Sequence, residues 1–83
     1  MIDKKTREQA ILVLDIASCH STGIENYLSP HDICIDFGYS KETQSLVYSV
    51  LYQASLALGV SPINSAEIRA EAAALLREDW SPE

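Results

Sequence analysis

Residues 40–59 read SKETQSLVYSVLYQASLALG, and this stretch decides the fold. It predicts one helix, because Ser40 is a good N-cap, Glu42 suits the positive end of the helix dipole, and Gly59 suits a left-handed terminating turn. At helical spacing the apolar residues fall on one broad stripe, which we expect to face the core. The stripe consists of Leu46, Val47, Val50, Leu51, Ala54, Ala57 and Leu58.

The opposite side of this helix is also uncharged. It carries Tyr48, Tyr52 and Leu56 among serines, and no charged residue occurs between Thr43 and Ala66. A helix without a charged face is usually enclosed by neighbouring helices or completed by a partner. Two interpretations follow. Either the other helices of this chain cover the tyrosines, or Tyr48 and Tyr52 anchor a partner or a second copy, a role in which tyrosine is favoured.

Three further helices are predicted around this one, each with a capping residue before it and an apolar face. The four helices span about residues 4–20, 30–37, 41–58 and 65–79. The caps of the other three are Asp3 or Thr6, then Ser29, then Asn64 or Ser65. Their predicted core residues are Ala10, Val13, Leu14, Ile16 and Ala17, with Ile11 and Leu12 widening that face, then Ile33, Cys34 and Phe37, and last Ile68, Ala72, Leu75, Leu76 and Trp80, with Ala73 beside them. We therefore expect an all-α fold, a compact four-helix domain formed by residues 1–83.

The charge of the chain limits its partners. Twelve acidic and six basic residues give a formal net charge of −6. Such a charge repels phosphate backbones and anionic membranes, and it favours proteins with a basic surface. Glu67, Glu71 and Glu78 line one side of the last helix. This side is either a solvated surface or a strip that docks on a basic protein.

The location predicted for the chain is the cytoplasm. Two cysteines are too few for a disulfide framework, and the charged residues at the amino terminus do not resemble a secretory signal. The longest apolar run is interrupted by polar residues and is too short to span a bilayer. We expect no membrane association.

Chemical motifs are missing from the sequence. It contains no Gly-rich phosphate loop, HExxH or GxSxG pattern. The candidate metal ligands are Cys19, His20, His31 and Cys34. Adjacent residues on a helix project to different sides, and the order of these four matches no common zinc site. Asp15 interrupts an apolar segment, where we expect it to be solvated or paired with a basic neighbour. We therefore predict no catalytic residue, no metal and no cofactor.

Residues 29–50 read SPHDICIDFGYSKETQSLVYSV. They combine a capped start, the small Cys34 four residues before Gly38, and a tight turn ending at Lys41. This segment resembles the helix-turn-helix of bacterial regulators, and the resemblance implies a helical corner whose second helix reads DNA bases. That helix needs several Arg, Lys, Asn or Gln side chains at its start, whereas Lys41 is the one basic residue there. Gln44 also occupies a position where the pattern has a buried aliphatic residue.

Together these features favour a small, acidic, non-enzymatic protein–protein interaction module: an adaptor, inhibitor or regulator. The predicted partner-binding residues are Tyr48, Tyr52, Glu67, Glu71 and Glu78. The expected partner is a protein with a basic surface, or a second copy that forms a homodimer. Phage- and plasmid-type accessory proteins have this size and charge. The alternative is a helix-turn-helix-like DNA-binding transcriptional regulator, in which dimerisation through the last helix presents two Lys41 ends to DNA.

Overall fold

The computed structural model describes residues 2–19, 29–59 and 66–81. They form four helices: α1 (Lys4–Cys19), α2 (Pro30–Asp36), α3 (Lys41–Leu58) and α4 (Ala66–Arg77). No strand occurs within these three ranges, and the predicted all-α, four-helix fold is confirmed. The predicted bounds of α3 agree with the structure, whereas α2 and α4 each end one or two residues earlier than predicted. The predicted end of the first helix at His20 and the predicted caps Asn64 and Ser65 lie outside the described residues.

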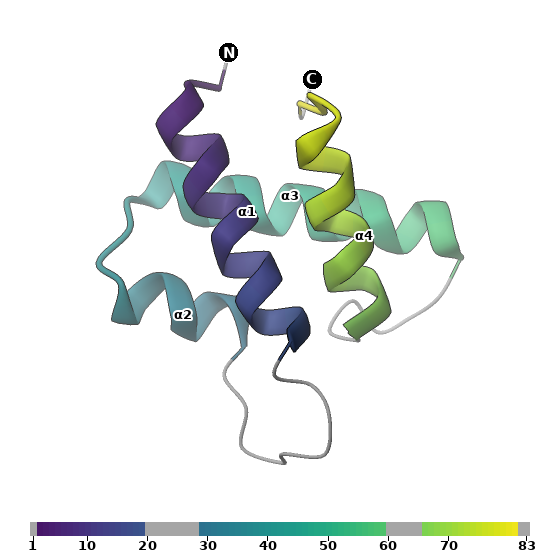
Figure 1. Cartoon of the computed structure of the whole chain (residues 1–83), viewed down its shortest axis with the longest axis horizontal. Helices are drawn as coiled ribbons and strands as arrows, with labels where there is room; N and C mark the ends of the chain where they lie inside the picture. The colour runs from purple at the N-terminus through teal and green to yellow at the C-terminus, as the bar shows by residue number, and fades with distance from the viewer. Residues whose placement is uncertain (1, 20–28, 60–65, 82–83) are drawn as a thin grey trace.

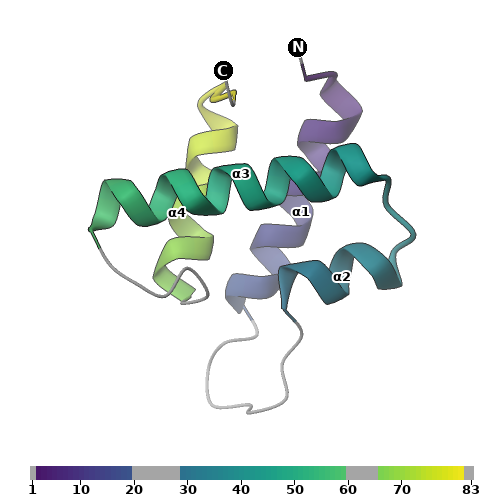
Figure 2. The ribbon, with the colours of Figure 1, turned by 180° about the vertical axis from the view of Figure 1, so that it is seen from behind.

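The helices form a shallow layer in which α3 lies across two others. Figure 1 shows α1 and α4 side by side, running in opposite directions, with α3 crossing behind both of them. Seen from the other side, α3 lies in front of them (Figure 2), and α2 contacts both α1 and α3. The extents of the Cα atoms are 36 × 30 × 16 Å. In such a thin arrangement the described helices pack against one side of α3, and none of them covers its other side.

One apolar cluster joins all four helices. Its buried members are Ala10, Val13, Leu14, Ala17, Ile33, Cys34, Leu46, Val47, Val50, Leu51, Ala54, Ile68, Ala72, Ala73 and Leu76. Most of these were predicted from periodicity. A chain of this size buries only about 60–65% of the surface that it exposes when unfolded. The stability of the fold therefore depends on a few fully covered side chains.

Four predicted core residues are exposed, and four others are partly buried against the cluster: Ile11, Ile16, Leu75 and Trp80. Leu12 is 45% exposed, because it lies on the side of α1 that faces away from the cluster. Ala57 and Leu58 are exposed in the last turn of α3, which extends past α4 (Figure 1). Phe37 is 48% exposed, because it follows the last turn of α2, and its ring packs edge-on against Tyr39 with the ring centroids 5.4 Å apart.

The α2–α3 corner is held by backbone hydrogen bonds. Gly38 adopts a left-handed φ of 69°, and its N–H donates to the Ile35 carbonyl over 3.0 Å. The Tyr39 N–H donates to the Cys34 carbonyl, also over 3.0 Å. These two bonds define a Schellman motif. This motif places Gly38 in the left-handed conformation, which glycine adopts without strain. Gln44 occupies the position where the helix-turn-helix pattern has an aliphatic residue. Its Nε2 donates to the Tyr39 carbonyl over 3.3 Å.

The same motif ends α4, but without a glycine. The Trp80 N–H donates to the Leu75 carbonyl over 3.1 Å, and the Asp79 N–H donates to the Leu76 carbonyl over 3.2 Å. Asp79 takes the left-handed position with a φ of 65°. A side chain with a Cβ is strained there, although Asp tolerates this region better than most residues.

Replacing Asp79 with glycine should therefore stabilise the protein by about 0.5–1 kcal/mol, because relief of backbone strain exceeds the entropy that glycine adds to the unfolded chain. Urea unfolding followed by circular dichroism measures the change. Asp79→Ala is the matched control and should be less stable than the glycine variant. If both variants lose stability equally, the Asp79 side chain itself holds the turn.

Two arginines join the antiparallel pair α1 and α4. Arg7 Nη1 donates to the carbonyls of Leu76 over 2.9 Å and Trp80 over 2.8 Å, at the end of α4. Arg69 Nη1 donates to the Ala17 carbonyl over 3.3 Å, near the end of α1. Each arginine is the fourth residue of its own helix. Each therefore places a positive charge at the negative end of the other helix dipole.

Candidate functional site

The tyrosines of α3 lie at the surface. Tyr48 is 47% exposed, Tyr52 is 60% exposed and Leu56 is 58% exposed. Residues four apart share one side of a helix, so these three form a stripe. The stripe lies opposite the buried residues of α3 that pack on α1 and α4. We call the stripe, together with Ser45 and Ser49 beside it, the outer face of α3. The described helices of this chain do not cover it (Figure 2).

The beginning of α2 borders this outer face. The rings of His31 and Tyr48 lie 5.9 Å apart at an interplanar angle of 34°. Ser29 caps α2 by accepting the Asp32 N–H over 3.2 Å, and this fixes the turn from which His31 projects. Ile35 lies one turn further along the same side of α2 and is 55% exposed. The contact with His31 restrains the Tyr48 ring while leaving much of it open to solvent.

The outer face carries no charged side chain. Lys41 and Glu42 in the first turn of α3 are the nearest charges on that helix, and the rest of α3 has none. Tyrosine presents a large apolar ring with a polar hydroxyl, so it functions both in water and within an interface. The outer face therefore combines apolar rings with hydroxyl groups and carries no charge of its own.

Half of the basic residues are engaged within the fold. Arg7 and Arg69 bind helix carbonyls, and Arg77 forms an ion pair with Asp15. The pairing of Asp15 with a basic neighbour was one of its two predicted roles. The three remaining basic residues are Lys4, Lys5 and Lys41, all of them exposed. A surface with so few available cations makes few phosphate contacts, and phosphate contacts supply most of the affinity for DNA.

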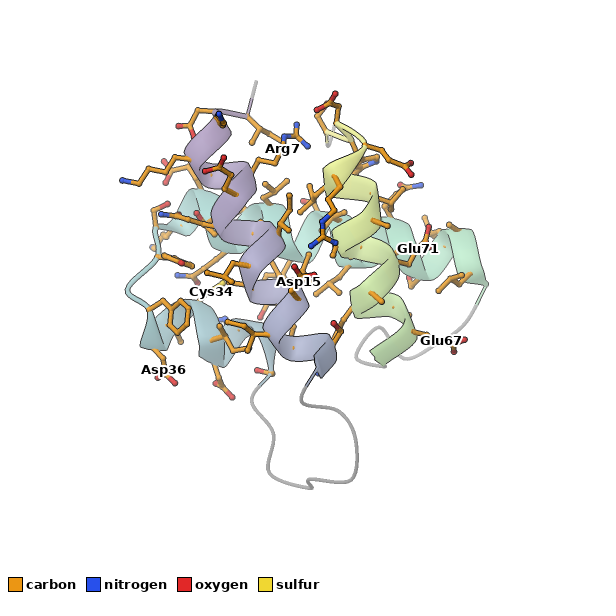
Figure 3. All side chains as sticks on the ribbon, viewed as in Figure 1. Arg7, Asp15, Cys34, Asp36, Glu67 and Glu71 are labelled. Atoms are coloured by element: carbon orange, nitrogen blue, oxygen red, sulfur yellow. The ribbon has the colours of Figure 1, made fainter. Side chains whose placement is uncertain are left out.

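The acidic residues of α4 occupy a different side of the molecule. Glu67 and Glu78 are exposed, and Glu71 is half-buried. All three lie on the side of α4 opposite its buried residues, and Figure 3 shows Glu67 and Glu71 pointing away from α1. The structure thus brings the two tyrosines together and brings the three glutamates together, but it separates the two sets. The predicted partner-binding residues therefore lie on two surfaces, one on α3 and one along α4.

A polar groove of about 500 Å³ lies where α1 begins and α2 turns into α3. Its lining residues are Asp3, Lys5, Thr6, Gln9, Gly38, Tyr39, Ser40 and Glu42. Periodicity does not reveal this groove, because its walls come from distant parts of the sequence. Asp3 caps α1 by accepting the Thr6 N–H over 2.7 Å, and this bond lowers the pKa of the Asp3 carboxyl below its ordinary value.

Several polar groups around this groove have partners within the fold. The buried Thr43 hydroxyl donates to Gln9 Oε1 over 2.8 Å, and the Ser40 hydroxyl accepts the Thr43 N–H over 3.4 Å. One lysine and two carboxylates give the groove both signs of charge. The Thr6 side chain also hydrogen-bonds the Asp3 carboxyl, and the bonds at Asp3 and Ser40 belong to the caps of α1 and α3.

The candidate metal ligands His31 and Cys34 do not lie in a common cluster in the described part of the chain. His31 is exposed and contacts Tyr48, whereas Cys34 lies in the core. Burial raises the pKa of the Cys34 thiol, which disfavours the reactive thiolate. No group of three or more His, Cys, Asp or Glu side chains among the described residues could hold a metal ion. The Cys19 side chain and His20 lie outside these residues.

None of the described helices has the length and apolar character needed to cross a membrane. No protein-family model, curated protein or solved structure matches the chain. Among the surfaces of the described helices, the outer face of α3 combines large exposed apolar side chains with the absence of charge.

Proposed function

We propose that this protein is a non-enzymatic interaction module, an adaptor, inhibitor or regulator, that contacts a protein partner through the outer face of α3. The observation that carries the proposal is the uncharged stripe of Tyr48, Tyr52 and Leu56, each about half exposed. Burying an apolar side chain of this size contributes about 1.5–3 kcal/mol. Three such side chains in a row, two of them tyrosines, have the composition of an interface centre.

The acidic side of α4 adds selectivity for the partner. Glu67, Glu71 and Glu78 give this side a negative charge, in a chain whose net charge is −6. Complementary charge speeds encounter and excludes unsuitable partners more than it adds affinity. We propose a partner protein with a basic patch that reaches this side, in the reducing cytoplasm, where the free thiol of the buried Cys34 is stable.

A DNA-binding regulator is the alternative, and it is favoured by the tight α2–α3 corner with the exposed Lys41 after it. The two functions differ in the affinity for duplex DNA that they predict at low salt. A DNA-binding protein has affinity for random duplex at low salt, and that affinity falls steeply as salt rises. We expect no measurable binding of duplex DNA at low ionic strength. Titration of a labelled duplex provides the measurement, and salt-sensitive binding would favour the regulator.

The double variant Tyr48→Gln/Tyr52→Gln tests the proposed surface. We expect its helix content and its free energy of unfolding to stay within about 1 kcal/mol of the wild type, because both side chains are exposed. Its affinity for the protein captured by the wild-type chain from the source cell should fall about 100-fold or more, since two interface anchors are lost. Circular dichroism and titration with that purified protein give the two numbers.

Leu12→Gln is the matched control for this experiment. Leu12 is a similarly exposed apolar residue, but it lies on α1 and outside the outer face. This variant should keep the full affinity of the wild type. If the tyrosine variant unfolds, the tyrosines contribute to the core. If the tyrosine variant and the control bind equally well, the outer face of α3 is not the contact surface.

A further inference from the structure

We infer that the outer face of α3 binds a second copy of this chain, with the two α3 helices antiparallel across a two-fold axis. The inference rests on the proposed function and names the occupant of the same surface. Three observations support it: the distribution of charge over the exposed sides of the helices, the spacing of the apolar stripe, and the polarity of α3.

Charge decides where two copies of this chain are able to meet. Each copy carries a formal charge of −6, so a close approach is costly wherever carboxylates face each other. The exposed sides of the other described helices hold carboxylates, for example Glu8 on α1, Asp36 on α2 and Glu67 on α4. The outer face of α3 holds none. It is therefore the helical face on which two copies lose little to repulsion.

The same feature makes a basic protein a poor occupant of this face. A basic surface gains from carboxylates placed around the contact, and lysines buried against an uncharged face lose hydration without finding a partner. The acidic side of α4 supplies such carboxylates, and it lies on a different side of the molecule. A second copy on α3 leaves that side free. The dimer would thus present two acidic strips to a basic partner.

The spacing of the stripe fits self-association. A two-fold interface uses the same patch on both copies, so the patch must match itself when reversed. Tyr48 lies four residues before Tyr52, and Leu56 lies four residues after it. In an antiparallel pair centred on Tyr52, this residue meets Tyr52 of the second copy, and Tyr48 meets Leu56 of the second copy. The small side chains of Ser45 and Ser49 beside the stripe allow the two helices to approach each other.

The polarity of α3 favours the antiparallel orientation. Opposed helix dipoles attract one another, and α3 has no basic residue in its last turn to balance its negative end. An antiparallel second copy brings its own first turn, the positive end of its helix dipole, toward that end, and the charges of Lys41 and Glu42 in that turn offset each other. The contact between His31 and Tyr48 also limits the motion of one ring before association, which reduces the entropy lost on binding.

Analytical ultracentrifugation of the full chain and its Tyr52 variants tests the inference. The wild type should sediment with twice the chain mass of 9.2 kDa at high concentration and dissociate on dilution. Tyr52→Glu and Tyr52→Lys should each weaken the dimer about 100-fold or more, because like charges then face each other on the two-fold axis. An equimolar mixture of the two variants should recover a heterodimer, since opposite charges then meet. Circular dichroism should show both variants fully helical.

If the wild type is monomeric at all concentrations, a second copy does not bind the outer face and the inference is wrong. In that case, loss of partner capture by the Tyr48→Gln/Tyr52→Gln variant would still support the proposed function. A dimer insensitive to Tyr52→Glu has its interface elsewhere, and this also overturns the inference. If each Tyr52 variant is monomeric and their mixture stays monomeric, the antiparallel pairing centred on Tyr52 is wrong. Leu12→Glu on α1 is the control and should leave the dimer intact.

Discussion

Replacing Leu14 with alanine is expected to lower the free energy of unfolding by about 3–5 kcal/mol, which is the largest effect of any single substitution considered for this chain. Leu14 lies on α1 and is 0% exposed, inside the cluster that joins all four helices. Truncating it removes apolar burial and leaves a cavity that the crossing helices cannot fill without moving. A domain of this size has a total stability of about 4–12 kcal/mol, so this substitution should remove a large fraction of it.

Leu12→Ala is the control for this substitution, because it makes the same chemical change two residues away on the same helix. Leu12 is 45% exposed, so its truncation should cost less than about 1 kcal/mol. Urea unfolding at one fixed protein concentration compares the two variants and keeps any effect of self-association constant. Equal losses for the two variants would mean that α1 presents a different side to the core.

Helix ends were predictable here because capping is local chemistry. Ser29 and Ser40 were predicted as caps, and each accepts a backbone N–H three residues ahead. Gly38 and Gly59 were predicted to end helices, and both adopt left-handed φ values, of 69° and 68°. The sequence left Asp3 and Thr6 as alternatives for α1. The structure selects Asp3, since it accepts the Thr6 N–H.

The extent of burial along each helix was less predictable. Periodicity gives the direction of the apolar side, but it does not say where a neighbouring helix stops. Leu58 is on the predicted side of α3 and is still 41% exposed, because α3 extends past α4. Thr43 was not predicted in the core, and it is fully buried where its hydroxyl meets Gln9 of α1. Such contacts join residues far apart in the sequence.

The candidate site was only half determined by the sequence. The absence of charge predicted that α3 is enclosed on both sides. It did not decide whether the other helices of this chain or a partner cover the tyrosines. The crossing of α1 and α4 over one side of α3 leaves Tyr48 and Tyr52 exposed on the other. Charge patterning likewise found the glutamates of α4. It could not show that they face a different side, because helix orientation is a property of the packed chain.

Arg69 is a further core residue that periodicity missed, and its replacement by alanine is expected to lower the free energy of unfolding by about 2–4 kcal/mol. It lies on α4 and is 1% exposed, and the small buried residues Ala72 and Ala73 follow one turn further along the same helix. Its Nη1 donates to the Ala17 carbonyl over 3.3 Å. Truncation leaves a large cavity, and this carbonyl loses a charged donor at the negative end of a helix dipole.

Arg77→Ala is the matched control, because it removes the same side chain from the same helix. Arg77 pairs with Asp15 at the surface, and the two side chains are 54% and 40% exposed. An ion pair in water contributes at most about 1 kcal/mol, so this variant should keep nearly all of its stability. Urea unfolding followed by circular dichroism again provides the comparison.

A third variant, Arg69→Met, separates the two causes of the loss at Arg69. Methionine restores much of the buried volume without the charge, and replacing a buried charge by an apolar side chain of similar size is often neutral or stabilising. If packing dominates, Arg69→Met should recover most of the stability that Arg69→Ala loses. If the bond to Ala17 dominates, methionine should be as harmful as alanine. If Arg69→Ala proves as mild as Arg77→Ala, the buried guanidinium makes no net contribution to the α1–α4 contact.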